Sequence, residues 1–255
     1  MSALVLSDLV SLRAGRDASA PVSLTAPIGA LTVLVGPNGC GKSTLLSSLT
    51  GALPYRGSAR LDGVELASLT PRERAKRIAL APQLPARPHL PLRDALRLAR
   101  TPYLSLSARL SESDLEAIDA AVEKAGATPY LDRTLDTLSG GELCRASLAL
   151  TLAQGASFLC LDEITAHLDP SASGELLTLV QRLTRESRYG VLLVLHDLSA
   201  ALAVADRIAV MRSDGTVAEG TPIELLATKV LDETFGVRRH ETSDGRIFFD
   251  ALQFS

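Results

Sequence analysis

One short glycine-rich segment, residues 36–44, restricts the possible folds of this chain more than any other feature of its sequence. An apolar run at 31–35 precedes the segment, and a helix-like stretch at 43–50 follows it. This order of strand, loop and helix is the context that a phosphate-binding loop requires, so the sequence predicts a phosphate site on an α/β sheet. The residues that match the phosphate-loop pattern are Gly36, Pro37, Asn38, Gly39, Cys40, Gly41, Lys42, Ser43 and Thr44.

The residue types in this loop are suited to hold a chain of phosphates together with a magnesium ion. Glycines let the backbone curl so that successive N–H groups converge on phosphate oxygens, and the following helix offers its positive end to the same anion. We expect Lys42 to reach the β- and γ-phosphates. The hydroxyl of Ser43 is expected to join the coordination shell of Mg²⁺, and Thr44 to add a phosphate contact.

Two adjacent carboxylates end a second apolar run. Residues 158–161 read Phe-Leu-Cys-Leu, and Asp162 and Glu163 follow directly. Carboxylates at the end of a buried strand are costly unless a cation or polar partners compensate them. Asp162 is suited to bind Mg²⁺ through water, and Glu163, on the other side of the strand end, is suited to polarise an attacking water. On their own, the two residues would fit an ordinary strand end equally well.

His196 and Gln83 are two further candidates that depend on their position. His196 follows the apolar run 191–195, which puts an imidazole at a strand end where a γ-phosphate could accept its hydrogen bond. Taken alone, His196 reads more simply as a surface histidine and Gln83 as a loop glutamine. These two residues become candidate site residues only when their positions are considered together with the other motifs of the chain.

Apolar runs elsewhere predict one α/β domain with a helical insert. Between about 84 and 155 helical signals replace strand signals, and Leu115, Ile118 and Val122 would share one helical face there. Ser111 and Asp114 fit a capping box at the start of that helix. We expect a single domain over 1–255, divided into a nucleotide-binding core at 1–83 and 156–220, a helical subdomain at 84–155 and a tail at 221–255.

Composition excludes several other classes of protein. The 26 Lys and Arg residues face 29 Asp and Glu residues without a basic block, so nucleic acid is not an expected partner. The apolar runs fall far short of the roughly 20 residues that a membrane-spanning helix needs, and no secretory signal is evident. Three cysteines without metal-ligand spacing predict free thiols. We therefore expect a cytosolic protein without a zinc site.

Residues 138–142, Leu-Ser-Gly-Gly-Glu, resemble the signature motif of ABC ATPases, and they lie between the phosphate loop and the Asp162–Glu163 pair as in that family. Gln83 then resembles the Q-loop glutamine, residues 166–169 the D-loop, and His196 the switch histidine. The resemblance implies a P-loop NTPase core of the ABC ATPase type, with a mixed sheet, an antiparallel β-subdomain and an inserted α-helical subdomain.

The same resemblance implies an activity, ligands, partners and a role for each of these residues. It makes the chain an ATPase with ATP and Mg²⁺ as ligands, working as a homodimer in which the signature of one copy completes the ATP site of the other. It also implies integral-membrane permease subunits as partners, a substrate-binding protein as an indirect partner, and a peripheral location on the cytoplasmic face of the membrane. Implied catalytic residues are Glu163, His196, Gln83 and Lys42; implied metal ligands are Ser43, Gln83 and Asp162; Ser139, Gly140, Gly141 and Asp169 join the phosphate loop in binding nucleotide.

A narrower resemblance, in residues 100–104, 108–114 and 235–237, is to the ATPases of iron-siderophore importers. Haem and cobalamin importers belong to the same broad group and remain alternatives for the cargo. A soluble ABC ATPase without a transporter, and a nucleotide switch with little turnover, remain alternatives for the function. Glu142, Leu143, Cys144 and Ile164 depart from the usual family residues glutamine, arginine, glutamine and proline, so we expect altered rates with activity retained.

Overall fold

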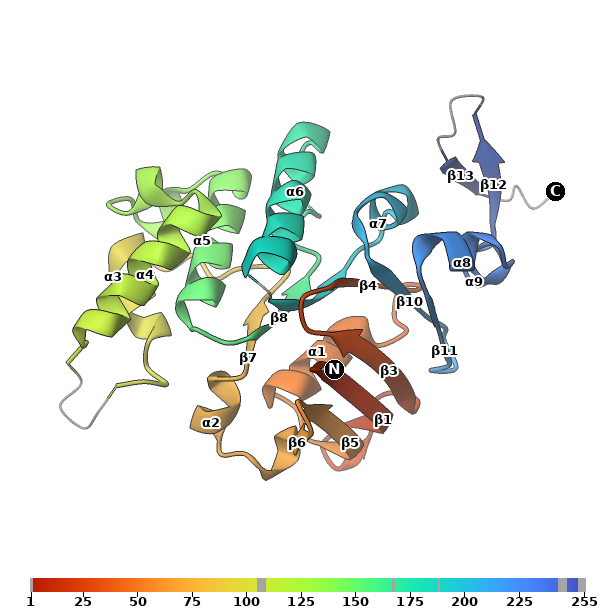
Figure 1. The fold of residues 1–255 in the computed structure, drawn as a ribbon, viewed down its shortest axis with the longest axis horizontal. Helices are drawn as coiled ribbons and strands as arrows, with labels where there is room; N and C mark the ends of the chain where they lie inside the picture. Colours follow the sequence, from red (N-terminus) through yellow and green to blue (C-terminus); the bar gives the residue numbers. More distant parts are fainter. Residues whose placement is uncertain (1, 105–108, 167, 188, 243–246, 252–255) are drawn as a thin grey trace.

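A computed structural model describes residues 2–104, 109–166, 168–187, 189–242 and 247–251 of the chain. Two large sheets, a set of helices and a small hairpin build the described part of the molecule (Figure 1). His167 of the predicted D-loop, and part of the segment 108–114, fall outside the described residues. Within the described residues, none of the helices is long and apolar enough to span a bilayer.

The larger sheet has six strands in the order β11-β10-β4-β9-β8-β7. All neighbouring pairs are parallel except β10 and β11. Strands β4, β8 and β9 are buried along their whole length, which matches their continuous apolar sequences. The strands are β4 (Leu31–Val35), β7 (Ile78–Ala81), β8 (Phe158–Asp162), β9 (Gly190–Val194), β10 (Arg207–Met211) and β11 (Val217–Gly220).

The second sheet is antiparallel and packs beside the first. Alternate residues of β3 are buried, as expected for a strand with one face on a core. The strands of this sheet are β1 (Ala3–Arg13), β2 (Arg16–Asp17), β3 (Val22–Pro27), β5 (Tyr55–Leu61) and β6 (Val64–Glu65). A mixed sheet, an antiparallel sheet and a run of helices between β7 and β8 agree with the predicted fold class.

Helices lie on both faces of the larger sheet. Helix α1 (Lys42–Thr50) lies between the two sheets, and α5 (Gly140–Ala153) and α6 (Pro170–Ser187) pack on the opposite face. The remaining helical segments are η1 (Leu66–Ser68), α2 (Pro71–Ala75), α3 (Leu92–Ala99), α4 (Glu112–Ala125), η2 (Thr128–Tyr130), η3 (Leu135–Thr137), α7 (Leu198–Val204), α8 (Pro222–Leu226) and α9 (Val230–Phe235). A hairpin of β12 (Val237–Glu241) and β13 (Ile247–Ala251) follows them.

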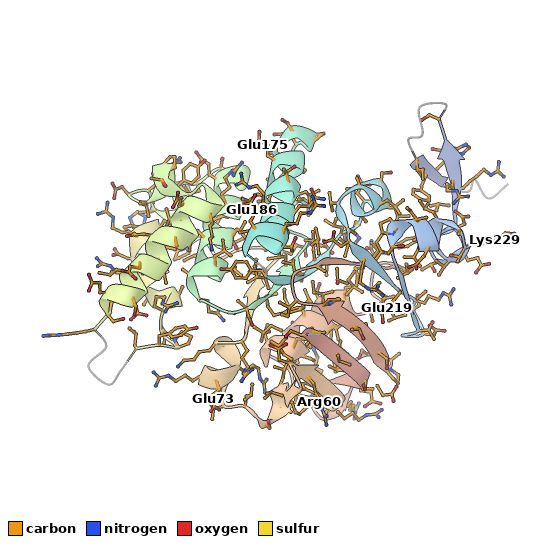
Figure 2. All side chains as sticks on the ribbon, in the orientation of Figure 1. Arg60, Glu73, Glu175, Glu186, Glu219 and Lys229 are labelled. Atoms are coloured by element: carbon orange, nitrogen blue, oxygen red, sulfur yellow. The ribbon has the colours of Figure 1, made fainter. Side chains whose placement is uncertain are left out.

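Two hydrophobic cores form on the two faces of the larger sheet. In β8, Leu159 and Leu161 join the core beneath the helices, while Phe158 and Cys160 join the core against α1 and the antiparallel sheet. This alternation follows from the two-residue period of a strand. Exposed charged side chains cover the outside of every layer, and Figure 2 labels six of them: Arg60, Glu73, Glu175, Glu186, Glu219 and Lys229.

The predicted helix in the insert is present, but one of the three apolar residues predicted to share a face of it is not buried. Ser111 and Asp114 form the expected capping box at the start of α4, and Ile118 and Val122 are buried. Leu115, which was predicted to share the face of Ile118 and Val122, is instead 46% exposed. Ile118 and Val122 are four residues apart on one side of α4, and of these three residues they are the ones that join the hydrophobic core.

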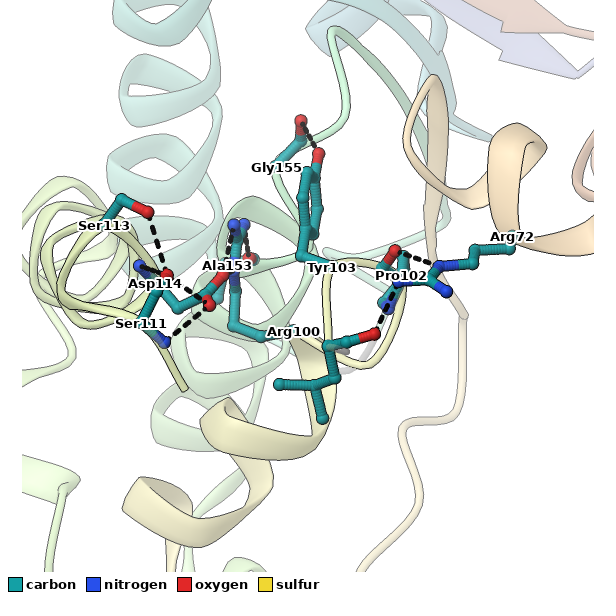
Figure 3. A network of polar contacts seen from close by, with 10 residues as sticks. Arg72, Arg100, Pro102, Tyr103, Ser111, Ser113, Asp114, Ala153 and Gly155 are labelled. Atoms are coloured by element: carbon teal, nitrogen blue, oxygen red, sulfur yellow. Dashed lines mark hydrogen bonds and ion pairs between the residues drawn. The ribbon is translucent and has the colours of Figure 1, made fainter. Parts of the chain in front are cut away.

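A buried ion pair joins the helices of the insert at one end. Arg100 donates to Asp114 at 2.9 Å and to the carbonyl oxygen of Ala153 at 2.9 Å, so it connects the ends of α3, α4 and α5 (Figure 3). Its guanidinium also stacks on the ring of Tyr103, 3.8 Å from the centroid. Arg72 at α2 reaches the carbonyl oxygen of Pro102 at 2.8 Å. This network fixes the insert against the part of the chain that precedes β7.

Candidate nucleotide-binding site

The phosphate loop turns tightly between β4 and α1. A Cβ atom on Gly36 would lie 2.4 Å from the carbonyl oxygen of Met211, so only glycine fits where the loop passes β10. Gly39 and Gly41 have positive φ angles of 81° and 105°. Gly41 caps α1 without a side-chain hydrogen bond, so the first N–H groups of α1 are free to bind an anion.

Lys42 folds back over this loop. Its Nζ donates to the carbonyl oxygens of Gly36 at 2.8 Å and Pro37 at 3.0 Å, and the residue is only 5% exposed. A buried ammonium needs such partners because an unpaired charge inside a protein is very costly. The two carbonyls hold the cation at the loop, within the space that the loop encloses.

The Glu163 carboxylate is held from two sides at the end of β8. Gln83 Nε2 donates to one oxygen at 2.5 Å, and the imidazole Nε2 of His196 bonds to the other. The backbone φ angle of Glu163 is 48°. This is a left-handed conformation that residues other than glycine, asparagine and aspartate seldom adopt. Such backbone strain persists only where the surroundings enforce it, and it is concentrated at functional sites.

Asp162, one residue earlier, is a buried carboxylate with an unused oxygen. Burial raises the pKa of Asp162 above its usual value, while a hydrogen bond from Ser43 works in the opposite direction. Among the described residues, no hydrogen-bond partner reaches its Oδ1. An oxygen of this kind next to a serine hydroxyl fits Mg²⁺, which prefers oxygen ligands and retains several waters.

Residues of the phosphate loop, together with Gln83, Glu163 and His196, line one pocket of about 430 Å³. The pocket brings together residues from the phosphate loop, the segment after β7, and the ends of β8 and β9. Its lining residues are Asn38, Gly39, Gly41, Lys42, Ser43, Thr44, Gln83, Glu163 and His196. All nine were singled out from the sequence, and polar groups of both charges converge there.

The described residues of the predicted signature motif and D-loop do not line this pocket. Ser139 caps α5 and is exposed, with Gly140 and Gly141 in the first turn behind it. The Oδ1 atom of Asp169 accepts a hydrogen bond from the backbone N–H of Ala172 at 2.9 Å, which caps the start of α6. One chain therefore presents a phosphate pocket and, separately, an exposed helix tip.

Two arginines near that tip were not identified from the sequence. Arg133 donates to Glu142 at 2.7 Å and to the carbonyl oxygen of Thr137 at 2.7 Å. Arg87 donates to the carbonyl oxygen of Leu138 at 3.1 Å. A lone arginine several residues from a motif carries no sequence pattern, so only the fold reveals these contacts.

A parallel sheet with a phosphate loop at a strand end, a facing carboxylate and an oxygen site for Mg²⁺ defines a P-loop nucleotide-binding protein. The family model described as ABC transporter matches residues 20–166. That match covers more than half of the chain, and the chain belongs to the ABC transporter ATP-binding family. The predicted resemblance to ABC ATPases is thereby confirmed, as is the predicted enzyme class, an ATPase.

Three relatives show which proteins of this family the chain resembles. The chain is 37% identical to the ferric enterobactin transport ATP-binding protein FepC of Escherichia coli, over 83% of this chain and 79% of the relative. It is 33% identical to the iron(3+)-hydroxamate import ATP-binding protein FhuC of Bacillus subtilis, over 88% and 84%. It is also 37% identical to the hemin import ATP-binding protein HmuV of Burkholderia pseudomallei, over 91% and 93%.

Solved structures agree on the fold. A metal-chelate type ABC transporter in an inward-facing conformation superposes with a TM-score of 0.81 at 19% identity, covering 99% of each chain. A nucleotide-free ATP-binding cassette of an ABC transporter gives a TM-score of 0.78 at 24% identity, covering 91% of this chain and 98% of the other. The fold class predicted from the sequence is confirmed.

Proposed function

We propose that this chain is the ATP-hydrolysing subunit of an ABC importer for iron-siderophore complexes, and that it closes as a homodimer around two ATP molecules. One observation carries the catalytic part. The Glu163 carboxylate is held by Gln83 and His196 in the same pocket as the phosphate-loop residue Lys42. A carboxylate oriented in this way opposite a phosphate cradle is suited to accept a proton from an attacking water.

Each residue of the pocket has its own role in the proposed hydrolysis. Lys42 leaves its two carbonyl partners for the β- and γ-phosphates, and the free N–H groups of the loop bind the remaining phosphate oxygens. Glu163 takes the proton of the water, Gln83 keeps the carboxylate in place, and His196 donates to the γ-phosphate. Ser43, Gln83 and Asp162 would hold Mg²⁺, which neutralises phosphate charge when it is bound.

The exposed tip of α5 supports the dimer part of the proposal. Ser139, Gly140 and Gly141 lie outside the pocket of their own chain and present a helix N-terminus, which attracts anions. In the proposed dimer, this tip and Asp169 complete the ATP site of the second copy. Closure then depends on ATP, and hydrolysis removes the ligand that favours the closed state.

An apolar pocket supports the coupling to a permease. It has a volume of about 360 Å³ and lies between the segment that follows Gln83 and helices α3 and α5. Leu84 and Leu98 are exposed beside it, at 71% and 63%. We propose that membrane subunits dock here, that residues 84–155 act as the signature subdomain, and that the chain is peripheral on the cytoplasmic face of the membrane.

Glutamine at position 163 tests the catalytic proposal. Glu163→Gln keeps the shape and a hydrogen-bonding group, but it removes the base, so ATP hydrolysis should fall by about 10²–10⁴-fold. Binding of a fluorescent ATP analogue should remain close to that of the wild type. Phosphate release from purified protein measures the first effect. An unchanged rate would refute Glu163 as the base, and a wild type without turnover would favour a nucleotide switch.

Uptake in cells tests the cargo. Lys42→Ala should abolish uptake of iron-siderophore complexes in a strain that carries the gene and its permease, because the ammonium at the phosphates is lost. Lys229→Ala, an exposed lysine in the tail, is the matched control and should leave uptake unchanged. The hemin relative makes haem the second candidate. Loss of haem uptake with intact siderophore uptake would overturn the cargo, and neither loss would favour a soluble ABC ATPase without a transporter.

A further inference from the structure

The signature tip of this chain carries a negative charge in its first turn. Glu142 is the third residue of α5, and its carboxylate accepts the N–H of Ser139 at 2.8 Å. The Ser139 backbone N–H, then Arg133, hold the pKa of Glu142 below its usual range, so the carboxylate is ionised at neutral pH. A carboxylate here stabilises the helix end, but it opposes any phosphate that approaches the same N-terminus.

One cation offsets this charge. Arg133 NH1 lies 2.7 Å from Glu142 Oε1, while NH2 donates to the carbonyl oxygen of Thr137 at 2.7 Å. Both side chains are partly exposed, at 40% and 26%, so the pair lies at the surface beside the tip. The family residue that usually follows position 142 is arginine, but this chain has Leu143, which is buried at 4% exposure and supplies no charge.

The backbone of Arg133 is itself held firmly. Its N–H donates to the carbonyl oxygen of Tyr130 at 3.0 Å, and its carbonyl oxygen accepts the N–H of Leu92, in the first turn of α3, at 3.0 Å. An antiparallel bridge between Pro91 and Thr134 follows directly. The guanidinium therefore extends from a fixed point on the insert, within hydrogen-bond reach of Glu142.

We propose that Arg133 is a positioning residue of the ATP sandwich, which neutralises Glu142 so that the tip at Ser139 can receive the phosphate of an ATP bound to the second copy. This inference rests on the dimer of the proposed function. It makes Arg133 and Glu142 a matched pair, so that neither residue acts independently. A purely structural role, in which Arg133 only fixes the carbonyl of Thr137, predicts a different response when the charge of Glu142 is removed.

A double-mutant cycle separates the two roles. In the Glu163→Gln background, Arg133→Ala should weaken Mg-ATP-dependent dimerisation about fivefold to twentyfold, because the charge of Glu142 is then no longer neutralised and opposes the phosphate at each of the two sites. Glu142→Gln keeps the capping geometry without the charge and should tighten the dimer. The double variant Arg133→Ala/Glu142→Gln should return to within about twofold of the parent. Sedimentation velocity across a range of protein concentrations measures the dimer constant.

Controls make each outcome decisive. Binding of a fluorescent ATP analogue to the monomer should be equal in all variants, since Arg133 lies outside the phosphate pocket. Arg97→Ala removes an exposed arginine of α3, which pairs with Asp94, and should not alter dimerisation. A parent protein that does not dimerise refutes the proposed sandwich itself. A parent that dimerises while Arg133→Ala is equally tight, or while the double variant is not restored, overturns the role of Arg133.

Discussion

Gly36 occupies a position where any side chain would collide with its neighbours. A Cβ there would lie 2.4 Å from the carbonyl oxygen of Met211 and 2.9 Å from the sulfur of Cys40. The first contact is with the backbone of β10, which cannot move without disturbing the centre of the sheet. The first glycine of the phosphate loop is therefore required by packing as well as by its approach to phosphate.

Gly36→Ala should consequently weaken both the fold and the site. Overpacking of this kind costs about 1–3 kcal/mol in the free energy of unfolding, and the displaced loop should bind ATP more weakly. Gly174→Ala on α6 is the control, since no atom lies within 4 Å of its added Cβ and alanine favours a helix by about 0.5–1 kcal/mol. Urea unfolding and nucleotide titration of both variants check this. Equal stability of Gly36→Ala and wild type would contradict the packing argument.

At the scale of elements, the ends of α3, α4 and α5 depend on one buried carboxylate. The side chain of Asp114 is 6% exposed and accepts hydrogen bonds from Ser111 at the start of α4 and from Arg100 at the end of α3. Hydrogen bonds from Ser111, then the Arg100 guanidinium, lower the pKa of Asp114 to about 2. This carboxylate is the centre of the network drawn in Figure 3.

Asp114→Asn should therefore destabilise the protein in a pH-dependent way. A lowered carboxyl pKa contributes stability above the unfolded value near 3.8, and this contribution is lost as the pH falls toward about 2. The variant should lose roughly 2 kcal/mol at pH 7, and the difference from wild type should shrink between pH 4 and pH 2. Asp17→Asn breaks an exposed pair with Arg56 and should change little. A difference that does not depend on pH would contradict this account.

Elements with strong local patterns were predictable, and weakly patterned ones were not. The apolar run at 31–35 coincides with β4, and the capping box at Ser111 marks the start of α4, because both signals are local. The hairpin of β12 and β13 was not predicted, since five-residue strands with mixed polar sequences give little signal. The sequence predicts a helical stretch near residues 175–186. Helix α6 begins five residues earlier, at Pro170, because helix ends depend on caps and packing.

The candidate site likewise contains residues that could be predicted from the sequence and contacts that could not. The nine residues that line the pocket were predicted for three reasons. The phosphate loop fixes the identity and the spacing of its own groups, Glu163 and His196 follow apolar strands, and the resemblance to ABC ATPases gave weight to these two residues and to Gln83. The contact of Arg133 with Glu142 could not be read from the sequence. That contact depends on how the loop before α5 folds against α3, which is a property of tertiary structure.

At the scale of the whole molecule, the two surfaces that the proposed dimer would bring to one ATP belong to separate parts of a single chain. The pocket holds Lys42 and Glu163, whereas the signature tip at Ser139 lies on the helical insert, outside the pocket. Pocket and tip could bind the same phosphates from two sides, since the pocket offers N–H groups and a cation and the tip offers another helix N-terminus. Two copies arranged head to tail would use both surfaces twice and close a symmetric dimer.

An experimental structure of Glu163→Gln protein with Mg-ATP tests this central claim most directly. The account predicts two copies related by a twofold axis, with each ATP lying between Lys42 of one copy and Ser139–Gly141 of the other. The mass in solution should then be twice 26.9 kDa with Mg-ATP and single without it. A monomer with ATP bound and the α5 tip in solvent, or a dimer joined through another face, would contradict the account.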